Sequence, residues 1–264
     1  MTAIPLRLLV PAAREAVRGR WLLGLGATLA LAGELLIRFG GGGATTIVSL
    51  LDIALIVTPL AAVVVGTMQV HNAREVTELF LAQPIARGRL FLGLYLGTAL
   101  PLAATLCVGL LAPFAWHGLF GTPVAGTLLA LGAVTAMLAM IGSALAFVIA
   151  LRADDRVRAL GIALAGWLCC AVLWDGVILL ITLMLGNRVV DAGLLIALAL
   201  NPIDVARVLL LLGTDASALF GYTGAVVQQT LGTTGGHVVL LIALAGWLVL
   251  PLWVAARTFN KKDF

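Results

Sequence analysis

Long apolar stretches separated by short polar segments run along the whole chain. Six of these stretches, at 21–37, 47–70, 90–112, 124–151, 159–185 and 237–256, are about as long as the roughly 20 residues that a helix needs to cross a bilayer. None of them shows the short alternating strands of a membrane barrel. The pattern therefore predicts an all-α polytopic membrane protein with six transmembrane helices, forming a single domain over residues 1–264. We interpret the first stretch as an uncleaved span, because no small-x-small cleavage site precedes the glycines at 40–43.

Composition supports this prediction and excludes several functions. The chain is 62% hydrophobic and 11% charged, whereas a soluble domain is about 45–50% apolar and about 25% charged. The sequence contains no GxxxxGK[ST] phosphate loop, no HExxH motif and no GxSxG motif. We therefore expect no catalytic site and no cofactor in this chain itself. We also expect the lipid bilayer as its surroundings and no nucleic-acid partner, in spite of the net charge of +4.

Basic residues are distributed unevenly between alternate polar segments. Four lie in the N-terminal arm at 1–20, and three lie in each of the segment 71–89, the segment 152–158 and the C-terminal tail. The intervening segments hold only Arg38, Arg188 and Arg207. Because short cytoplasmic loops are enriched in Lys and Arg, this pattern predicts that both termini and the segment 71–89 are cytoplasmic. The arm has an amphipathic helical pattern that suits the membrane surface, although an ordinary basic flank looks the same.

The segment 71–89 has a helical pattern of its own. Glu75, Glu78 and Leu79 fall within about one helical turn, and Pro84 ends the pattern before Arg87 begins the next element. We expect a short cytoplasmic helix that lies across the ends of two spans. A rigid helix transmits a displacement that a flexible loop would absorb, so this segment suits contact with a partner. The alternative is an amphipathic loop that only caps the two spans.

The region 186–236, between the last two spans, is too apolar for a free loop. Its run at 192–200 is too short to cross a membrane, and Asn201 and Pro202 interrupt it before the apolar character resumes at 208–212. We expect two short helices that lie at the outer membrane surface or re-enter the membrane, with Pro202 at a helix start. Such a region indicates a surface for a second copy or a periplasmic partner, the alternative being packing against lipid headgroups.

Three acidic residues fall inside the predicted spans. Glu34 precedes Arg38 by four residues, a spacing that lets the two pair on one helix face. Asp52 lies near the outer end of its span, where we expect it to be solvated. Asp175 lies deeper, where a charge costs roughly 3 kcal/mol unless it is paired. The spans contain no basic partner for it, so we expect it to be protonated or hydrogen-bonded to Ser or Thr, in a structural role or a transport role.

Potential metal ligands do not converge in the sequence. Adjacent Cys169 and Cys170 point about 100° apart on a helix. Met137 and Met140 share a face, but methionines at that spacing are more typical of packing. The three histidines lie on different segments. We therefore predict no metal site in this chain.

The stretch REVTELFLAQPIARGRLFLG, residues 74–93, resembles the first cytoplasmic loop of the type-2 ABC exporter permeases. In that family this segment is the coupling helix, which docks into a groove of a separate ATPase subunit. The six-span layout, the basic arm and the tail RTFNKKDF fit the family too. The resemblance implies that ATP and Mg belong to the partner ATPase. It assigns ATPase contact to Glu75, Glu78, Leu79, Phe80, Gln83, Pro84 and Arg87.

A narrower resemblance covers LALNPIDVARVLLLLGTDASALFGYTGAV. This stretch is similar to the outer region of the permeases that belong to nitrous-oxide-reductase maturation transporters. It implies a homodimeric permease in a bacterial inner membrane, with two copies of an ATPase and a periplasmic accessory protein, for assembly of the reductase's copper–sulfur centre. Two other functions remain open: a generic exporter of a lipid, drug or peptide, and a mechanotransmitter that moves no substrate. The expected partner or dimer contacts are Asn201, Pro202, Asp204, Arg207 and Tyr222.

Overall fold

The computed structural model describes residues 20–40, 44–81, 86–122, 124–185, 196–212 and 234–262. Every regular element in these residues is helical. Six helical segments are long and apolar enough to cross a membrane: Trp21–Phe39, Val48–Asn72, Arg87–Trp116, Ala125–Arg152, Arg156–Leu180 and Gly235–Lys261. The all-α class and the six spans are therefore confirmed. The helices overshoot several predicted ends, because their backbone hydrogen bonds continue past the apolar core of each span.

Most spans consist of one helix, and the fifth is built from three successive elements. The first four spans are α2 (Arg20–Phe39), α3 (Ala44–Asn72), α5 (Arg87–Trp116) and α6 (Ala125–Arg152). The fifth joins α7 (Arg156–Leu168), the π-helical turn η2 (Cys169–Leu173) and α8 (Trp174–Leu185), and the sixth is α12 (Thr234–Lys261). The short elements are α4 (Arg74–Leu81), the 3-10 turn η1 (Leu119–Gly121) and α10 (Pro202–Leu212).

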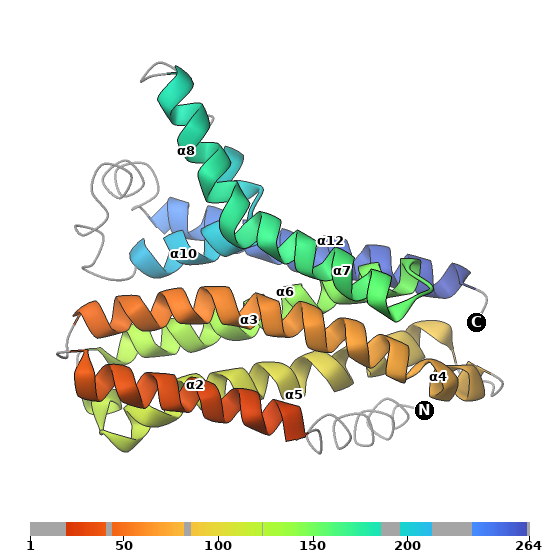
Figure 1. The fold of residues 1–264 in the computed structure, drawn as a ribbon, viewed down its shortest axis with the longest axis horizontal. Coiled ribbons are helices and arrows are strands. Elements are labelled where there is room, and N and C mark those ends of the chain that lie inside the picture. The colour runs from red at the N-terminus through yellow and green to blue at the C-terminus, as the bar shows by residue number, and fades with distance from the viewer. Residues whose placement is uncertain are drawn as a thin grey trace.

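The fourth span is the centre of the helical bundle. Helix α6 packs against α3, α5 and α12, while α2 packs on α5 and α7 packs on α3 (Figure 1). Accordingly, 67% of the apolar stretch that identifies the fourth span is buried inside the bundle. The corresponding share is 11% for the fifth span and 22% for each of the first and sixth spans. The peripheral spans thus expose large apolar surfaces, which is the arrangement expected of a protein surrounded by lipid.

Small residues allow the central helices to approach closely. A Cβ placed on Gly142 of α6 would lie 2.6 Å from the Cβ of Ala62 in α3. A Cβ placed on Gly109 of α5 would lie 2.5 Å from the carbonyl oxygen of Gly26 in α2. Close backbone contact of this kind is how helices associate where water supplies no hydrophobic driving force between them.

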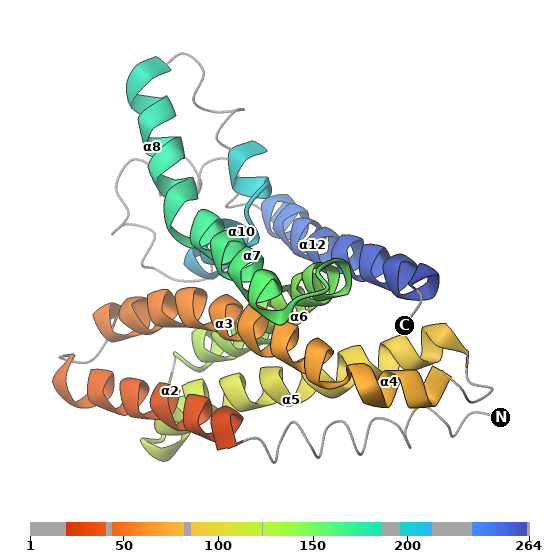
Figure 2. The same ribbon diagram turned by 45° about the vertical axis from the view of Figure 1, so that its right-hand side comes forward.

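Polar features gather at the two opposite ends of the bundle. Helix α4, the α6–α7 turn and the C-terminal end of α12 lie together at one end, which we call the α4 end (Figure 1). The start of α3, the turn η1 and α10 lie at the other, which we call the α10 end (Figure 1). At the α10 end, α8 leaves the bundle and points away from the remaining helices (Figure 2).

Candidate functional site

Helix α4 continues α3 across one end of the bundle. Ala73 is the single residue between the two helices. Its N–H donates to the Gln69 carbonyl at 2.9 Å, and its own carbonyl accepts from the Thr77 N–H at 2.8 Å. The Thr77 hydroxyl donates to the same carbonyl at 2.6 Å. Ala73 is therefore hydrogen-bonded to both helices, and these bonds fix the orientation of α4 relative to α3.

The two faces of α4 differ sharply in exposure. Thr77 faces inward and is 3% exposed, whereas Leu79 is 70% exposed. Glu78 is also exposed, and its Oε1 lies 3.5 Å from Arg74 Nε, a pairing that supports a short helix at this spacing. The predicted short helix is present, and its outer face combines an apolar side chain with a charged pair. A face of that composition suits a protein partner better than either water or lipid alone.

Two of the residues that were expected to contact an ATPase make contacts within their own chain. Phe80 is half-buried and packs against the cluster that contains Phe91 and Phe147. Arg87 Nη1 donates to the carbonyl of Asn260 at 2.9 Å and to that of Lys262 at 3.3 Å. Phe80 thus packs between α4 and the bundle, and Arg87, which is exposed, links α5 to α12. Sequence reasoning missed the second contact because 173 residues separate the partners. That either residue contacts an ATPase stays a prediction.

Some of the predicted residues lie outside the described part of the chain. These are Gln83, Pro84, Tyr222, residues 1–19 of the basic arm and most of 186–236. Glu75 is in α4, but its side chain is not among those described.

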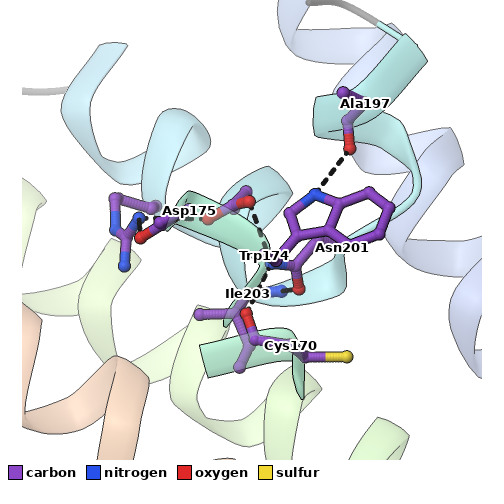
Figure 3. A network of polar contacts seen from close by, with 8 residues as sticks. Cys170, Trp174, Asp175, Ala197, Asn201 and Ile203 are labelled. Carbon is purple, nitrogen blue, oxygen red and sulfur yellow. Dashed lines mark hydrogen bonds and ion pairs between the residues drawn. The ribbon is translucent and has the colours of Figure 1, made fainter. Parts of the chain in front are cut away.

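The second polar centre is built around η2. A π-helical turn shifts the hydrogen-bond register and leaves a carbonyl without its usual helical partner. The Cys170 carbonyl in this turn accepts a hydrogen bond from Asn201 Nδ2 at 2.7 Å (Figure 3). The segment before α10 is thus hydrogen-bonded to the fifth span at the π-helical turn of that span.

The Asn201 side chain forms the start of α10. Its Nδ2 also donates to Asp204 Oδ2 at 2.9 Å, and its Oδ1 accepts from the Ile203 N–H at 3.1 Å. An asparagine immediately before a helix satisfies free N–H groups, and a proline at the first helical position needs none. The prediction that Pro202 begins a helix is confirmed. Asn201 is 1% exposed, so its amide groups depend on these partners.

Arg207 of α10 joins two carboxylates. Its Nη1 lies 3.0 Å from Asp175 Oδ2 on α8 and 3.0 Å from Asp204 Oδ1 on α10 (Figure 3). The expectation that Asp175 lacks a basic partner is therefore wrong, because α10 folds back onto the fifth span and supplies one. Arg207 could be singled out from the sequence, because it lies in the stretch that carries the narrower resemblance. The sequence did not indicate which acid would pair with it.

Asp204 is the most perturbed acid in the described chain. It lies outside the six candidate spans and is 6% exposed. Burial and the nearby Asp175 carboxylate raise its pKa from 3.8 to about 6, against the opposing effects of Arg207 and Asn201. The protonated form of Asp204 is therefore easier to populate than for an ordinary surface aspartate.

The outer residues that were expected to form a contact surface are mostly interior. Asn201, Pro202 and Asp204, which were expected to contact a partner or a second copy, are buried within the chain. They lie inside because α10 packs between α3, α6 and α12. The accessible edge of the network is Asp175, with 48% of its side chain exposed, and Arg207, with 25%.

Two tryptophans, which sequence reasoning did not single out, hold the segment before α10. Trp174 Nε1 on α8 donates to the Ala197 carbonyl at 3.1 Å. Trp247 Nε1 on α12 donates to the Ala199 carbonyl at 2.9 Å. Residues 196–199 form a helical turn, and the Ala197 carbonyl also accepts from the Leu200 N–H at 3.3 Å. The fifth and sixth spans thus both bind the end of this turn.

The ion pair predicted for Glu34 is present in the structure. Arg38 Nε donates to Glu34 Oε1 at 2.6 Å, which confirms the predicted pair. His117 Nδ1 lies 3.7 Å from the other Glu34 oxygen. Asp52 is exposed on the first turns of α3. In the part of the chain that the structure describes, no group of three or more His, Cys, Asp or Glu residues is arranged to hold a metal ion.

Six apolar helices with polar centres at their ends define a multi-pass helical membrane protein. The chain belongs to the ABC-2 family transporter proteins, whose family model matches residues 42–264. It is similar to the probable ABC transporter permease protein NosY of Pseudomonas aeruginosa, with 29% identity over 265 residues that cover 94% of each chain. The protein of the same description from Stutzerimonas stutzeri is 24% identical over 264 residues, covering 94% of this chain and 95% of its own. An ABC transporter permease implies an ATPase partner and a membrane.

Proposed function

We propose that this chain is the permease subunit of a bacterial inner-membrane ABC transporter that serves maturation of the copper–sulfur centre of nitrous oxide reductase. Two copies of the permease work with two copies of a separate ATPase on the cytoplasmic side and with a periplasmic accessory protein. The two NosY-named relatives, similar over nearly their whole length, support this assignment. ATP hydrolysis belongs to the partner subunit, and this chain converts the movement of that subunit into a change at the periplasmic end.

One observation is central to the proposal: α4 is a short helix fixed to the end of a span, with its apolar Leu79 directed outward. Leu79 is 70% exposed beside the charged Glu78. A protein groove that covers this face buries an apolar side chain and surrounds it with polar contacts, the usual anatomy of an interface. Because Ala73 is hydrogen-bonded on both sides, a displaced α4 moves the end of α3 with it.

The coupling role is tested by co-purification with the ATPase. Leu79→Asp places a charge where the apolar contact forms, so we expect the ATPase subunit to be lost from the purified complex. Val157→Asp is the matched control, because Val157 is 76% exposed and begins α7 at the same end of the bundle. If Leu79→Asp retains both the ATPase and its rate of ATP turnover, α4 is not the coupling element.

The maturation role needs a separate test in cells. A denitrifying bacterium that lacks its own permease is complemented with this chain, and the copper content and activity of its nitrous oxide reductase are measured. Restored copper–sulfur centres support the proposal. If the chain does not complement the bacterium, and the purified complex moves a lipid, drug or peptide in liposomes when ATP is added, the protein is a generic exporter instead.

A further inference from the structure

We propose that the C-terminal turn of α12 positions the coupling helix, with Arg87 and Lys262 as the positioning residues that join α5, α6 and α12 beside α4. The inference rests on the proposed function in one respect, that α4 receives the movement of the ATPase. It adds a second route for that movement, through the sixth span, to the direct connection between α4 and α3.

Arg87 occupies the point where the chain leaves α4 and enters α5. It is the first residue of α5, and its Nη1 donates to the carbonyls of Asn260 and Lys262 at the end of α12. The last carbonyls of a helix have no helical partner and form the negative end of its dipole. A guanidinium group there satisfies two carbonyls and matches the local charge. The start of α5 is thus fixed to the end of α12.

Lys262 extends this junction to a third helix. Its Nζ donates to the Leu151 carbonyl at 2.7 Å, in the last turn of α6, and lies 3.5 Å from Asp154 Oδ1. Only 18% of its side chain is exposed, so the ammonium group depends on these contacts. The backbone of Lys262 accepts from Arg87 while its side chain donates to α6. One residue therefore ties the start of α5 to the end of α6.

Aromatic side chains fill the space beneath this junction. The rings of Phe91 on α5 and Phe259 on α12 are 5.7 Å apart, and Phe147 on α6 meets Phe91 edge-on at 6.0 Å. Phe80 of α4 packs against the same cluster. A displacement of α4 therefore pushes on a packed aromatic core as well as on the Arg87 contact. Packed cores transmit displacement because they have few voids to absorb it.

Helix α12 leads from this junction to the opposite end of the molecule. It runs as one helix from Thr234 to Lys261, with Pro251 inside it. Near its middle, the indole N–H of Trp247 donates to the Ala199 carbonyl, and α10 packs against α12. A shift of the C-terminal turn thus reaches the segment that carries Asn201. Figure 1 shows α12 running from the α4 end of the bundle towards α10.

The test compares Arg87→Gln and Lys262→Gln with two neighbouring controls. Arg89→Gln and Lys261→Gln remove the same charges from exposed positions at the same end of the bundle. Each variant is assembled with the ATPase, in a background without Cys107, Cys169 and Cys170 and with a cysteine at Ile196, which is 63% exposed. The measurement is the maleimide reaction rate of that cysteine with and without ATP.

We expect Lys262→Gln to assemble with the ATPase and to turn over ATP, and we expect both Arg87→Gln and Lys262→Gln to lose the ATP-dependent change in labelling rate. Arg87→Lys, which still donates to a carbonyl, should restore part of the change, and both controls should resemble the unaltered chain. Positioning is overturned if Arg87→Gln responds to ATP as the unaltered chain does. It is also overturned if both Gln variants fail to assemble, because the role is then structural. If the unaltered complex shows no ATP response at 196, the coupling function fails instead, whatever Arg87 does.

Discussion

At the scale of single residues, Asn201 shows how a buried amide connects distant parts of the chain. Its side chain bonds the Cys170 carbonyl, the Asp204 carboxylate and the Ile203 N–H. Those partners lie on η2 and on α10, so the amide fastens a short helix to the irregular turn of the fifth span. Because the site is almost fully buried, water does not replace the lost bonds when the amide is removed.

Asn201→Ala should therefore lower the stability of the folded chain by about 1–3 kcal/mol, the usual cost of leaving buried polar groups without partners. The measurement is the melting temperature of the purified protein in detergent, taken from its thermal unfolding. Asn260→Ala is the control, since Asn260 is exposed and only its backbone carbonyl is in use. Equal melting temperatures for the two variants would show that the network contributes little to stability.

The sequence could identify the polar residues of this centre but not their partners. Asn201, Asp204 and Arg207 stand out against an apolar background, whereas Arg207 and Asp175 are 32 residues apart and belong to different helices. Pairing at that separation depends on how α10 folds back onto α8. The π-helical turn at 169–173 had no signal either, because its apolar residues look the same in an ordinary helix.

At the scale of elements, the helices approach each other where small residues face each other. Gly109 of α5 meets the backbone of Gly26 in α2, and an added Cβ would lie 2.5 Å from its carbonyl oxygen and 2.9 Å from its Cα. Backbone atoms cannot move aside as a flexible side chain can. Any larger residue at Gly109 therefore forces the two spans apart.

Gly109→Ala should destabilise the protein by about 1–3 kcal/mol, the cost typical of overpacking. Gly246→Ala is the matched control in α12, because an added Cβ there meets nothing within 4 Å. Alanine also favours helix over glycine, so the control should be neutral or slightly stabilising. Chemical or thermal unfolding of both variants in detergent decides the point, and a Gly109→Ala protein as stable as the control would contradict the close contact.

Elements were predictable from sequence where their signals were local. Hydropathy alone located all six spans, since each needs a continuous apolar run. The placement of Glu75, Glu78 and Leu79 within about one helical turn, ahead of Pro84, indicated α4. The inward turn of Phe80 and the contact of Arg87 with α12 could not be predicted, because both depend on the three-dimensional arrangement of α5, α6 and α12.

At the scale of the whole molecule, the charge distribution predicts which end faces the cytoplasm. The α4 end holds Arg74, Arg87 and Lys262, together with most of the other basic residues of the described chain. The α10 end holds fewer, and Arg207 there is already paired with two acids. Positive segments are retained on the cytoplasmic side during insertion. The α4 end should therefore be cytoplasmic.

Cysteine labelling in intact cells tests this orientation. In the cysteine-free background, Trp116→Cys, at a position that is 89% exposed beside η1, should react with a membrane-impermeant thiol reagent added from outside. Val157→Cys, at the α4 end, should react only after the membrane is permeabilised. The reverse result would place α4 in the periplasm, where no ATPase can reach it.

The single-residue joint at Ala73 makes the angular phase of α4 unusually sensitive to chain length. An α-helix turns by about 100° per residue, so one inserted residue would rotate Leu79 by roughly a quarter turn about the helix axis. The exposed leucine would then point to the side of α4, and Thr77 would lose its inward position against the bundle. Length variation among related permeases should therefore accumulate in the other connections, while the distance from α3 to α4 stays constant to the residue.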